Sequence, residues 1–257
     1  LEHPLTQPNN GWHPVEIRLT DTPFRAVDQT SEGQIRFPGP RASLGVISDI
    51  DDTILKTDVT FPLKLKAIYH TLLKNAGSRR TFQEVAAFYQ ALALGPDRHA
   101  DNPFFYVSRS PWNLHDLLEE FLSLNGLPAG PLLLRDFGLP SEPAPANSPG
   151  HKYQRIAHLL KIYPTLPFVL IGDSGERDTD IYLEVNRDFP GRIAAIYIRD
   201  VRSRSRARRI RDLIGSSGEK HAHLIRTYGE AAVDAAQQGL IDYSFFESLR
   251  GRNRGLF

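Results

Sequence analysis

The sequence predicts an α/β fold: a doubly wound, three-layer parallel sheet of Rossmann-like type with a small helical cap insertion, preceded by a β-rich N-terminal segment. From residue 44 onward, short apolar runs alternate with stretches of helical periodicity, which is the pattern of a parallel sheet. Most of these runs are continuously apolar, as expected for strands that are covered on both faces. Polar residues follow several of the runs, at the sheet edge where such folds bind ligands.

The first 43 residues differ in composition from the rest of the chain. They are rich in Pro, Gly, Thr and Asn, and short alternating pieces at 15–19, 24–27 and 34–37 indicate strands joined by turns. Three short strands are too few for a core of their own. We therefore interpret residues 1–43 either as the remnant of a β-rich domain or as strands that pack on the following domain, which we place at 44–257.

The remaining chain alternates strands and helices. The candidate strands are apolar runs at 44–48, 104–108, 132–134, 168–172 and 193–198. Helices are predicted at 113–124 and 153–163, and the first carries its apolar residues on one face: Leu114, Leu117, Leu118, Phe121 and Leu122. Beyond about residue 212 we predict two further helices packed across the sheet edge, at 221–228 and 230–238.

The stretch between the first two predicted strands is long enough for a cap insertion, which we place at about 57–100. Apolar residues indicate two short amphipathic helices: Leu63, Leu65, Ile68, Leu72 and Leu73 in one, and Phe82, Val85, Phe88, Tyr89 and Leu92 in the other. A cap of this size leaves the cleft open to a bulky substrate. The alternative is that both helices are ordinary parts of the core.

Composition excludes several classes of site. The chain of 257 residues has no cysteine, which rules out disulfides, thiolate catalysis and cysteine-ligated zinc. Its formal net charge of +1 provides no global attraction for polyanions, so we expect no nucleic-acid partner. The longest apolar runs are far shorter than the roughly 20 residues of a membrane-spanning helix, and nothing at the N-terminus resembles a signal peptide. We therefore expect a cytoplasmic protein without a transmembrane segment, whose contact with membranes, if any, is peripheral.

Residues 46–54 read VISDIDDTI and place three carboxylates within four positions, directly after an apolar run. Like charges at this spacing repel one another, so Asp49, Asp51 and Asp52 cost stability unless a cation or a reaction uses them. The simpler alternative is a solvated turn with a helix cap. Further polar residues follow later predicted strands or begin the helix before them: Ser108, Lys152, Asp173 and Asp178. Since the carboxyl ends of parallel strands meet at one edge, these residues are predicted to share one site.

This set of side chains suits the hydrolysis of a phosphate ester. Asp49 can attack phosphorus as a nucleophile, giving an aspartyl-phosphate that water then hydrolyses. Asp51 projects beside Asp49 in an extended segment, so it can protonate the leaving oxygen and later accept a proton from water. Two anions must approach each other, and Mg²⁺ bound by oxygen ligands offsets their repulsion.

We assign these roles residue by residue. The predicted catalytic residues are Asp49, Asp51 and Lys152. The predicted phosphate ligands are Ser108, Arg109 and Lys152, which offset the charge on the transferred phosphoryl group. The predicted Mg²⁺ site uses carboxylates, with Asp178 acting on the metal directly or through its waters: Asp49, Asp51, Asp173 and Asp178.

The same residues resemble a known superfamily. The sequences DIDDT at 49–53 and GDSGERD at 172–178, together with Ser108 and Lys152, resemble in order the four motifs of haloacid dehalogenase-type phosphatases. The longer motifs YVSRSPW at 106–112, LRDFG at 134–138 and HK at 151–152 make residues 44–202 similar to the catalytic domain of the actin-patch-protein phosphatidate phosphatases.

That resemblance implies Mg²⁺-dependent conversion of phosphatidate to diacylglycerol. It implies Asp49 as nucleophile and Asp51 as general acid and base. The other implied ligands are Ser108 and Lys152 for the phosphate, and Asp173 and Asp178 for the metal. Arg109 and Thr179 depart from the family pattern, which has a small or amide residue and a proline at these positions.

A basic run follows the fifth predicted strand. It begins at Arg199, ends at Arg211 and has seven arginines in thirteen residues. One interpretation is a landing site for an anionic membrane, since a basic residue near a membrane surface contributes about 1 kcal/mol. The other is a solvated helix face paired with acidic neighbours. On the first interpretation, removing four arginines weakens binding to anionic liposomes and spares a soluble substrate: Arg204, Arg206, Arg208 and Arg209.

Other functions predict different residue patterns. A phospho-receiver of two-component signalling also combines a phosphoacceptor aspartate with Mg²⁺, but it has no acid two residues later, so Asp51 favours turnover. A dehalogenase needs no acid to protonate a leaving alkoxide. Two alternatives stay open: a phosphatase of small soluble phosphate esters, because the motifs touch only the phosphoryl group, and a non-catalytic protein that binds anionic lipid.

Three residues near the motifs each allow two interpretations. Trp112 and Phe137 can contact an acyl chain or simply pack against the fold, as aromatic residues after strands usually do. His151 can hydrogen-bond a phosphate, or it can be a helix-start histidine without that role.

Overall fold

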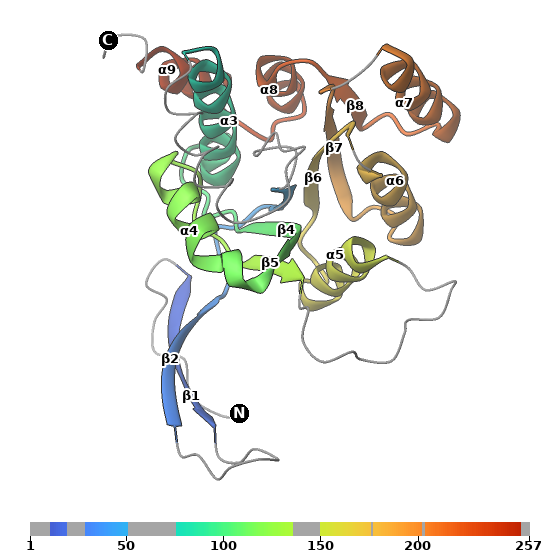
Figure 1. Cartoon of the computed structure of the whole chain (residues 1–257). Helices are drawn as coiled ribbons and strands as arrows, with labels where there is room; N and C mark the ends of the chain where they lie inside the picture. The colour runs from blue at the N-terminus through green and yellow to red at the C-terminus, as the bar shows by residue number, and fades with distance from the viewer. Residues whose placement is uncertain are drawn as a thin grey trace.

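The computed structural model describes residues 11–19, 29–50, 76–135, 150–175, 177–201 and 204–252. Over these residues the chain forms a six-stranded parallel sheet with helices on both faces, and a separate two-stranded hairpin (Figure 1). The sheet order is β5-β4-β3-β6-β7-β8. Its strands are β3 (Gly45–Asp49), β4 (Phe104–Pro111), β5 (Leu132–Arg135), β6 (Phe168–Asp173), β7 (Ile193–Arg199) and β8 (Ala222–Ile225). The predicted α/β fold is confirmed.

The strands are continuous apolar runs because helices cover both faces of the sheet. All residues of β3 and of β6 are buried. Gly45 in β3 has no room for a side chain, since a Cβ atom there would overlap the ring of Phe168 in β6. The central strands therefore lie in close contact, and their register fixes the positions of the polar residues at their ends.

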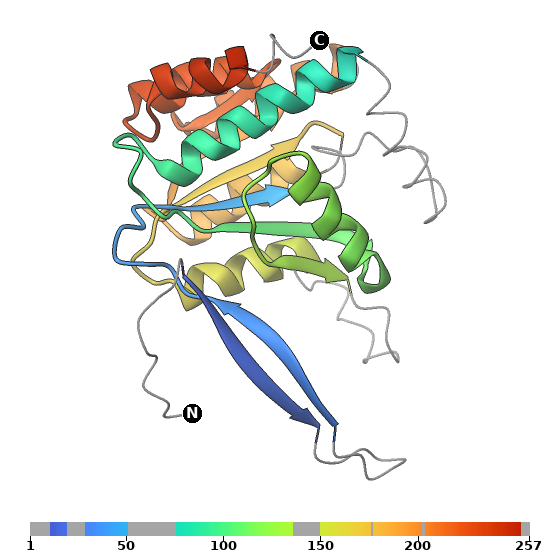
Figure 2. The same cartoon turned by 90° about the vertical axis from the view of Figure 1, so that its left-hand side faces the viewer.

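Two helical layers enclose the sheet (Figure 2). One layer shares a core with one face of the sheet and contains α3 (Ala76–Leu94), α4 (His115–Leu124), α8 (Tyr228–Gln237) and α9 (Tyr243–Arg252). The other shares a second core with the opposite face and contains α5 (His151–Ile162), α6 (Asp178–Asp188) and α7 (Arg204–Ser217). None of the helices in the described ranges is long and apolar enough to span a membrane.

Helix α3 bears on the two interpretations of the cap region. It contains the residues predicted to form the second cap helix, and Val85, Phe88 and Leu92 are buried in the core. The same helix packs against α8 and α9. Its apolar face therefore completes the core, which agrees with the alternative that this helix is an ordinary part of the fold. The first predicted cap helix lies outside the described residues, so the cap at about 57–100 stays a prediction.

The C-terminal region corrects one prediction. The predicted helix at 221–228 is wrong, because Ala222–Ile225 form β8, which pairs in parallel with β7. A run of four residues is too short to show helical or strand periodicity, so pairing with β7 decides its conformation. The next predicted helix is present as α8, which Thr227 caps by accepting a hydrogen bond from the Glu230 amide.

The N-terminal hairpin consists of β1 (Trp12–Leu19) and β2 (Gln29–Arg36), paired antiparallel. It extends away from the sheet (Figure 2), and its base is attached to the main domain. Arg36 is buried and its Nη2 lies 2.6 Å from Asp101 Oδ1, while the Tyr163 hydroxyl donates to the Arg36 carbonyl at 3.3 Å. The strand predicted at 24–27 lies outside the described residues.

Candidate active site

Three polar side chains lie on the central strands at the same edge of the sheet. Asp49 is the last residue of β3 and lies opposite Val107 of β4, so Ser108 is the next residue along that edge. Ser48 lies opposite Ile171 of β6, and Asp173 ends β6 two residues later. Because β4, β3 and β6 are neighbours, the structure brings Asp49, Ser108 and Asp173 together.

Lys152 contacts two of the predicted site carboxylates. It is the second residue of α5, and this helix begins at the same edge of the sheet. Its Nζ lies 3.0 Å from Asp49 Oδ2 and 2.5 Å from Asp178 Oδ1. Lys152 is 4% exposed, whereas Asp49, Asp173 and Asp178 are 0% exposed. These four residues form a buried charge cluster, which we call the carboxylate cluster.

Asp178 is held in the carboxylate cluster by the backbone as well as by Lys152. Its Oδ2 accepts a hydrogen bond from the Asp173 amide at 3.2 Å. Gly172 gives this carboxylate the room it needs, since a Cβ atom at Gly172 would overlap the Asp178 side chain. As the first residue of α6, Asp178 also places a negative charge at a helix N-terminus, where the helix dipole stabilises it.

The turn after Asp173 is fixed by contacts with the β7–α7 region. The Gly175 amide donates to Asp173 Oδ1 at 2.5 Å, which orients that carboxylate. Arg206 of α7 donates from Nη1 to the Gly175 carbonyl at 2.7 Å, and the Val201 amide donates to Ser174 Oγ at 3.0 Å. Arg206 therefore supports the residues that orient Asp173, a contact that the sequence pattern did not indicate.

The two predicted phosphate ligands on β4 lie in different environments. Ser108 is fully buried, and its Oγ accepts a hydrogen bond from the Ser110 amide at 2.8 Å. Arg109 is exposed. Consecutive strand residues point to opposite faces of a sheet, so we expect the Arg109 side chain to point away from that of Ser108, and its predicted role stays a prediction.

Buried tyrosines lie near the carboxylate cluster, and no sequence pattern assigned them to the site. Burial, followed by the nearby charges of Asp178, Asp49 and Asp173, raises the pKa of Tyr182 well above its usual value. Burial also raises the pKa of Tyr228 to about 12. These phenols are therefore neutral at physiological pH and add no charge to the site. Tyr182 and Tyr228 lie on helices of the two opposite layers, so only the fold places both beside the same carboxylates.

The donor chemistry of the carboxylate cluster suits Mg²⁺. Mg²⁺ prefers oxygen ligands and commonly uses one or two carboxylates together with substrate phosphate and water. With the carboxylates ionised, the cluster holds three negative charges and one positive charge, so a divalent cation would balance it. Within the described ranges, no three histidine or acidic side chains converge in a ready-made metal site. Both oxygens of Asp178 are engaged, one by the Lys152 ammonium and the other by the Asp173 amide, so Asp49 and Asp173 are the donors that best fit direct ligation.

Other predicted residues lie outside the cluster or outside the described ranges. Asp51 and Phe137 belong to the second group, so their predicted roles stay predictions. His151 is half-buried, and its Nε2 accepts a hydrogen bond from Arg155 Nε at 3.3 Å. Trp112 is exposed, at 60%.

The chain is similar to known proteins of one family. A family model described as the catalytic domain of phosphatidate phosphatase APP1 matches residues 44–200. The chain is 36% identical over 192 residues to phosphatidate phosphatase APP1 of Saccharomyces cerevisiae, covering 72% of this chain and 31% of that protein. It is 30% identical over 165 residues to an uncharacterized protein of Schizosaccharomyces pombe, covering 63% of this chain and 26% of that protein. The chain thus spans about a third or less of the length of these two relatives. No solved structure matches it.

Proposed function

The chain belongs to the family of the phosphatidate phosphatase APP1 catalytic domain, and on that premise we propose that it is a Mg²⁺-dependent phosphoric monoester hydrolase that converts phosphatidate to diacylglycerol. The observation that carries the proposal is the carboxylate cluster, in which Lys152 contacts Asp49 and Asp178 at the carboxyl edge of the sheet. Ser108 lies at the same edge, on the neighbouring strand.

In the proposed reaction, a carboxylate oxygen of Asp49 attacks phosphorus and forms an aspartyl-phosphate, while the bond between phosphorus and the ester oxygen breaks. Asp51 gives its proton to the leaving alkoxide, which departs as the alcohol. Water then attacks phosphorus, Asp51 takes a proton from that water, and inorganic phosphate leaves with Asp49 restored. The sequence spacing supports the role of Asp51, since residues two apart in an extended segment lie on the same side.

The surrounding side chains orient the nucleophile and offset charge. The Lys152 ammonium lies 3.0 Å from Asp49 Oδ2, so it fixes that carboxylate and places a positive charge where phosphoryl oxygens arrive. Ser108 contributes a hydroxyl beside them. Mg²⁺ held by Asp49 and Asp173, with Asp178 acting through water, would reduce the repulsion between the nucleophile and the phosphate dianion.

The test of the nucleophile is Asp49→Asn. An amide does not attack phosphorus, so we expect kcat for any accepted ester to fall by roughly a thousandfold or more. The matched control is Asp180→Asn, because Asp180 is an acidic residue of α6 that pairs with Arg209 away from the cluster. Retained turnover in Asp49→Asn would refute the assignment.

The test of the substrate is a panel of phosphate monoesters assayed with Mg²⁺. It compares phosphatidate in mixed micelles with sugar phosphates, nucleotides and a chromogenic ester, and we expect the highest kcat/KM for phosphatidate. A preference for a soluble ester would overturn the lipid assignment and leave the mechanism standing. Lipid binding without turnover of any ester would instead support the non-catalytic alternative.

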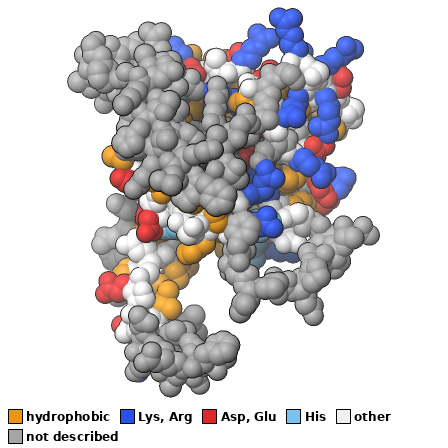
Figure 3. Space-filling view, in the orientation of Figure 1, with side chains coloured by type: hydrophobic (Ala, Val, Ile, Leu, Met, Phe, Trp, Pro, Cys, Tyr) orange, Lys and Arg blue, Asp and Glu red, His pale blue; other side chains and the backbone are white. Residues whose placement is uncertain are grey.

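We propose further that the protein contacts anionic membranes through α7. Lys and Arg side chains gather over the part of the surface where α7 lies (Figure 3). Arg204, Arg208 and Arg211 are exposed, and their spacing places them on one stripe of the helix. These residues make no ion pair with any other described residue. Positive charges in the first turns of a helix oppose its dipole, so the stripe costs stability that an anionic surface would offset.

A further inference from the structure

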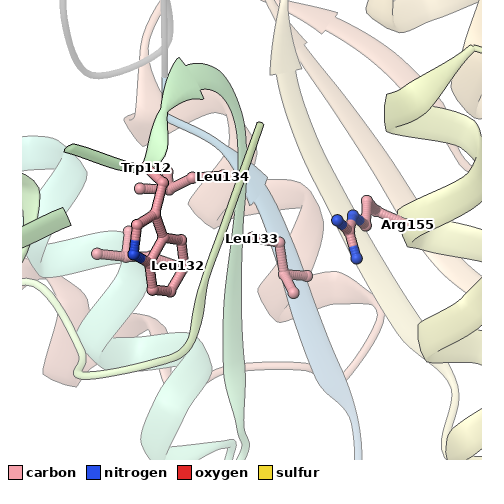
Figure 4. A pocket seen from close by; sticks show the side chains of 5 residues that line it. All are labelled: Trp112, Leu132, Leu133, Leu134 and Arg155. Atoms are coloured by element: carbon pink, nitrogen blue, oxygen red, sulfur yellow. The ribbon is translucent and has the colours of Figure 1, made fainter. Parts of the chain in front are cut away.

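A pocket of about 360 Å³ lies along the edge strand β5 (Figure 4). Leu132 and Leu134 lie on the side of Trp112, while Leu133 lies toward Arg155 on α5, as the alternation of side chains along a strand requires. The side chains that line the pocket are thus four apolar ones and one guanidinium group. The volume of the pocket falls within the range of small-molecule sites.

The elements that line the pocket lie next to those of the candidate active site. Leu133 of β5 lies opposite Val107, the residue before Ser108. Trp112 directly follows β4, the strand that carries Ser108. Arg155 lies three residues after Lys152 in α5, which is about one helical turn. Two walls of the pocket are therefore built next to the phosphate-binding residues, on α5 and directly after β4, and the third is built on β5, which pairs with β4. A molecule with its phosphate at Ser108 and Lys152 can extend toward the pocket.

Trp112 lacks the environment of an aromatic residue that stabilises the core. It is 60% exposed, and it contacts the ring of His115, with the ring centroids 5.0 Å apart. By contrast, Phe105 and Tyr106 of β4 are buried. An indole exposed at the rim of a pocket that three leucines line offers a large contact area to an apolar ligand.

The charges around the pocket favour an anionic ligand. Arg155 lines it, Arg135 ends β5, and the His151 side chain accepts a hydrogen bond from Arg155. No acidic side chain is among the described residues that line the pocket. A ligand that combines a phosphate group with an apolar chain matches both the lining and the charge.

We propose that this pocket binds the acyl part of the substrate next to its phosphate, and that Trp112 and Leu133 determine the preference for acylated over non-acylated esters. The proposal rests on the proposed phosphatase function of the adjacent site. In this arrangement the phosphoryl group lies at Asp49 and Lys152, the glycerol lies beyond Ser108, and the first segment of an acyl chain contacts Trp112.

The kinetic test compares two esters that share the glycerol phosphate group: dihexanoyl phosphatidate, kept below its critical micelle concentration, and glycerol 3-phosphate. We expect Trp112→Ala and Leu133→Ser to lower kcat/KM for the acylated ester about tenfold, mainly through KM, and to leave glycerol 3-phosphate unchanged. Trp112→Phe should keep most of the wild-type kcat/KM for the acylated ester. The matched control is Leu124→Ala, which removes another exposed apolar side chain, at the end of α4. Equal losses on both esters, or a wild-type preference for glycerol 3-phosphate, would overturn the proposal.

A binding test separates this proposal from the catalytic one. In an Asp49→Asn, Trp12→Phe protein, Trp112 is the only tryptophan. Dihexanoyl phosphatidate should shift Trp112 emission to shorter wavelength, and glycerol 3-phosphate should not. If the emission shifts but the wild-type protein, which keeps Asp49, turns over no ester, the proposed function is contradicted and the pocket is supported. The absence of a shift would overturn the pocket, whatever the activity.

Discussion

Lys152 is the residue whose environment is most unusual for its type. A lysine is rarely buried without a partner, and the ammonium of Lys152 contacts two carboxylates that are themselves buried. Buried ion pairs contribute little net stability, because desolvation of the charges offsets their attraction. Such a cluster is therefore better explained by chemistry than by folding, which is the physical basis for locating the site here.

Arg206 and Arg209 lie on the same helix but differ in what they contact. Arg206 donates to the Gly175 carbonyl beside Asp173, whereas Arg209 pairs with Asp180 at the surface. We expect Arg206→Ala to lower kcat for a soluble chromogenic ester about tenfold or more, because the support of Asp173 is lost. The kcat of Arg209→Ala should stay within about twofold of the wild-type value, since an exposed ion pair such as that of Arg209 contributes little to stability.

The second readout for Arg206 is the thermal stabilisation of each variant by added Mg²⁺, which does not depend on turnover. Weaker stabilisation in Arg206→Ala than in Arg209→Ala would support the role in positioning Asp173. Equal responses of the two variants would contradict it. The variant that removes Arg204, Arg206, Arg208 and Arg209 together is therefore not a clean test of membrane binding, because Arg206 also supports the active site.

His151 makes stability depend on pH in a definite direction. Burial, followed by the charges of Arg155 and Arg135, lowers the pKa of His151 below its ordinary value of 6.5. As the pH falls below about 6.5, the unfolded chain therefore takes up this proton before the folded protein does, and stability is lost as the pH falls further. We expect the loss of unfolding free energy between pH 7.5 and 5.5 to be smaller in His151→Gln, measured by urea denaturation. His158→Gln, an exposed position on the same helix, is the control, and an equal pH slope in both variants would contradict the prediction.

At the scale of elements, α3 shows how a helix after a long insertion becomes part of the core. Phe88 is fully buried and packs against Tyr197 of β7 and Tyr228 of α8, with ring centroids 5.7 Å apart in each pair. We expect Phe88→Ala to lower the unfolding free energy by about 3–5 kcal/mol, the usual effect of removing a large buried ring. Urea denaturation measures this loss of unfolding free energy. The control is Val233→Ala, which removes an exposed side chain of α8 and should have a much smaller effect. If α3 were a cap helix, Phe88→Ala would change the unfolding free energy little and would alter the substrate preference.

At the scale of the whole molecule, the exposed stripe of α7 lies beside the active-site edge, because α7 follows the carboxyl end of β7. Replacing Arg204, Arg208 and Arg211 with glutamine should weaken binding to anionic liposomes by roughly a hundredfold at low salt, given about 1 kcal/mol for each charge. Turnover of a soluble ester should be unaffected. Added salt should weaken wild-type binding in the same way, because it screens exposed charges.

The control for this prediction carries the same change in charge at the opposite edge of the sheet. Arg41, Arg98 and Lys161 are exposed and precede β3, β4 and β6, respectively. Their triple glutamine variant should bind liposomes like the wild type. If both triple variants lose the same affinity, only net charge matters and α7 is not a specific contact surface.

Part of the fold and of the site follows from local sequence. The central strands are continuous apolar runs, and this pattern holds wherever both faces of a strand are covered. Asp49, Ser108 and Asp173 could be assigned to one edge because each ends or directly follows such a run and because parallel strands share their carboxyl edge. Helix α4 was predictable for a similar reason, since its apolar residues recur on one face. Strand β8 was not, because four residues carry no periodicity and pairing with β7 decides their conformation.

The type of sheet, the identity of the acidic residues and the edge where they meet could all be predicted from the amino-acid sequence, because these depend on local periodicity and on a general property of parallel sheets. In contrast, three features became visible only in the folded protein: α3 belongs to the core, Arg206 supports the Asp173 turn, and Trp112 lies at the rim of a pocket. These features depend on contacts between segments far apart in the chain. Such contacts are selected by packing and by hydrogen bonds that no local pattern encodes.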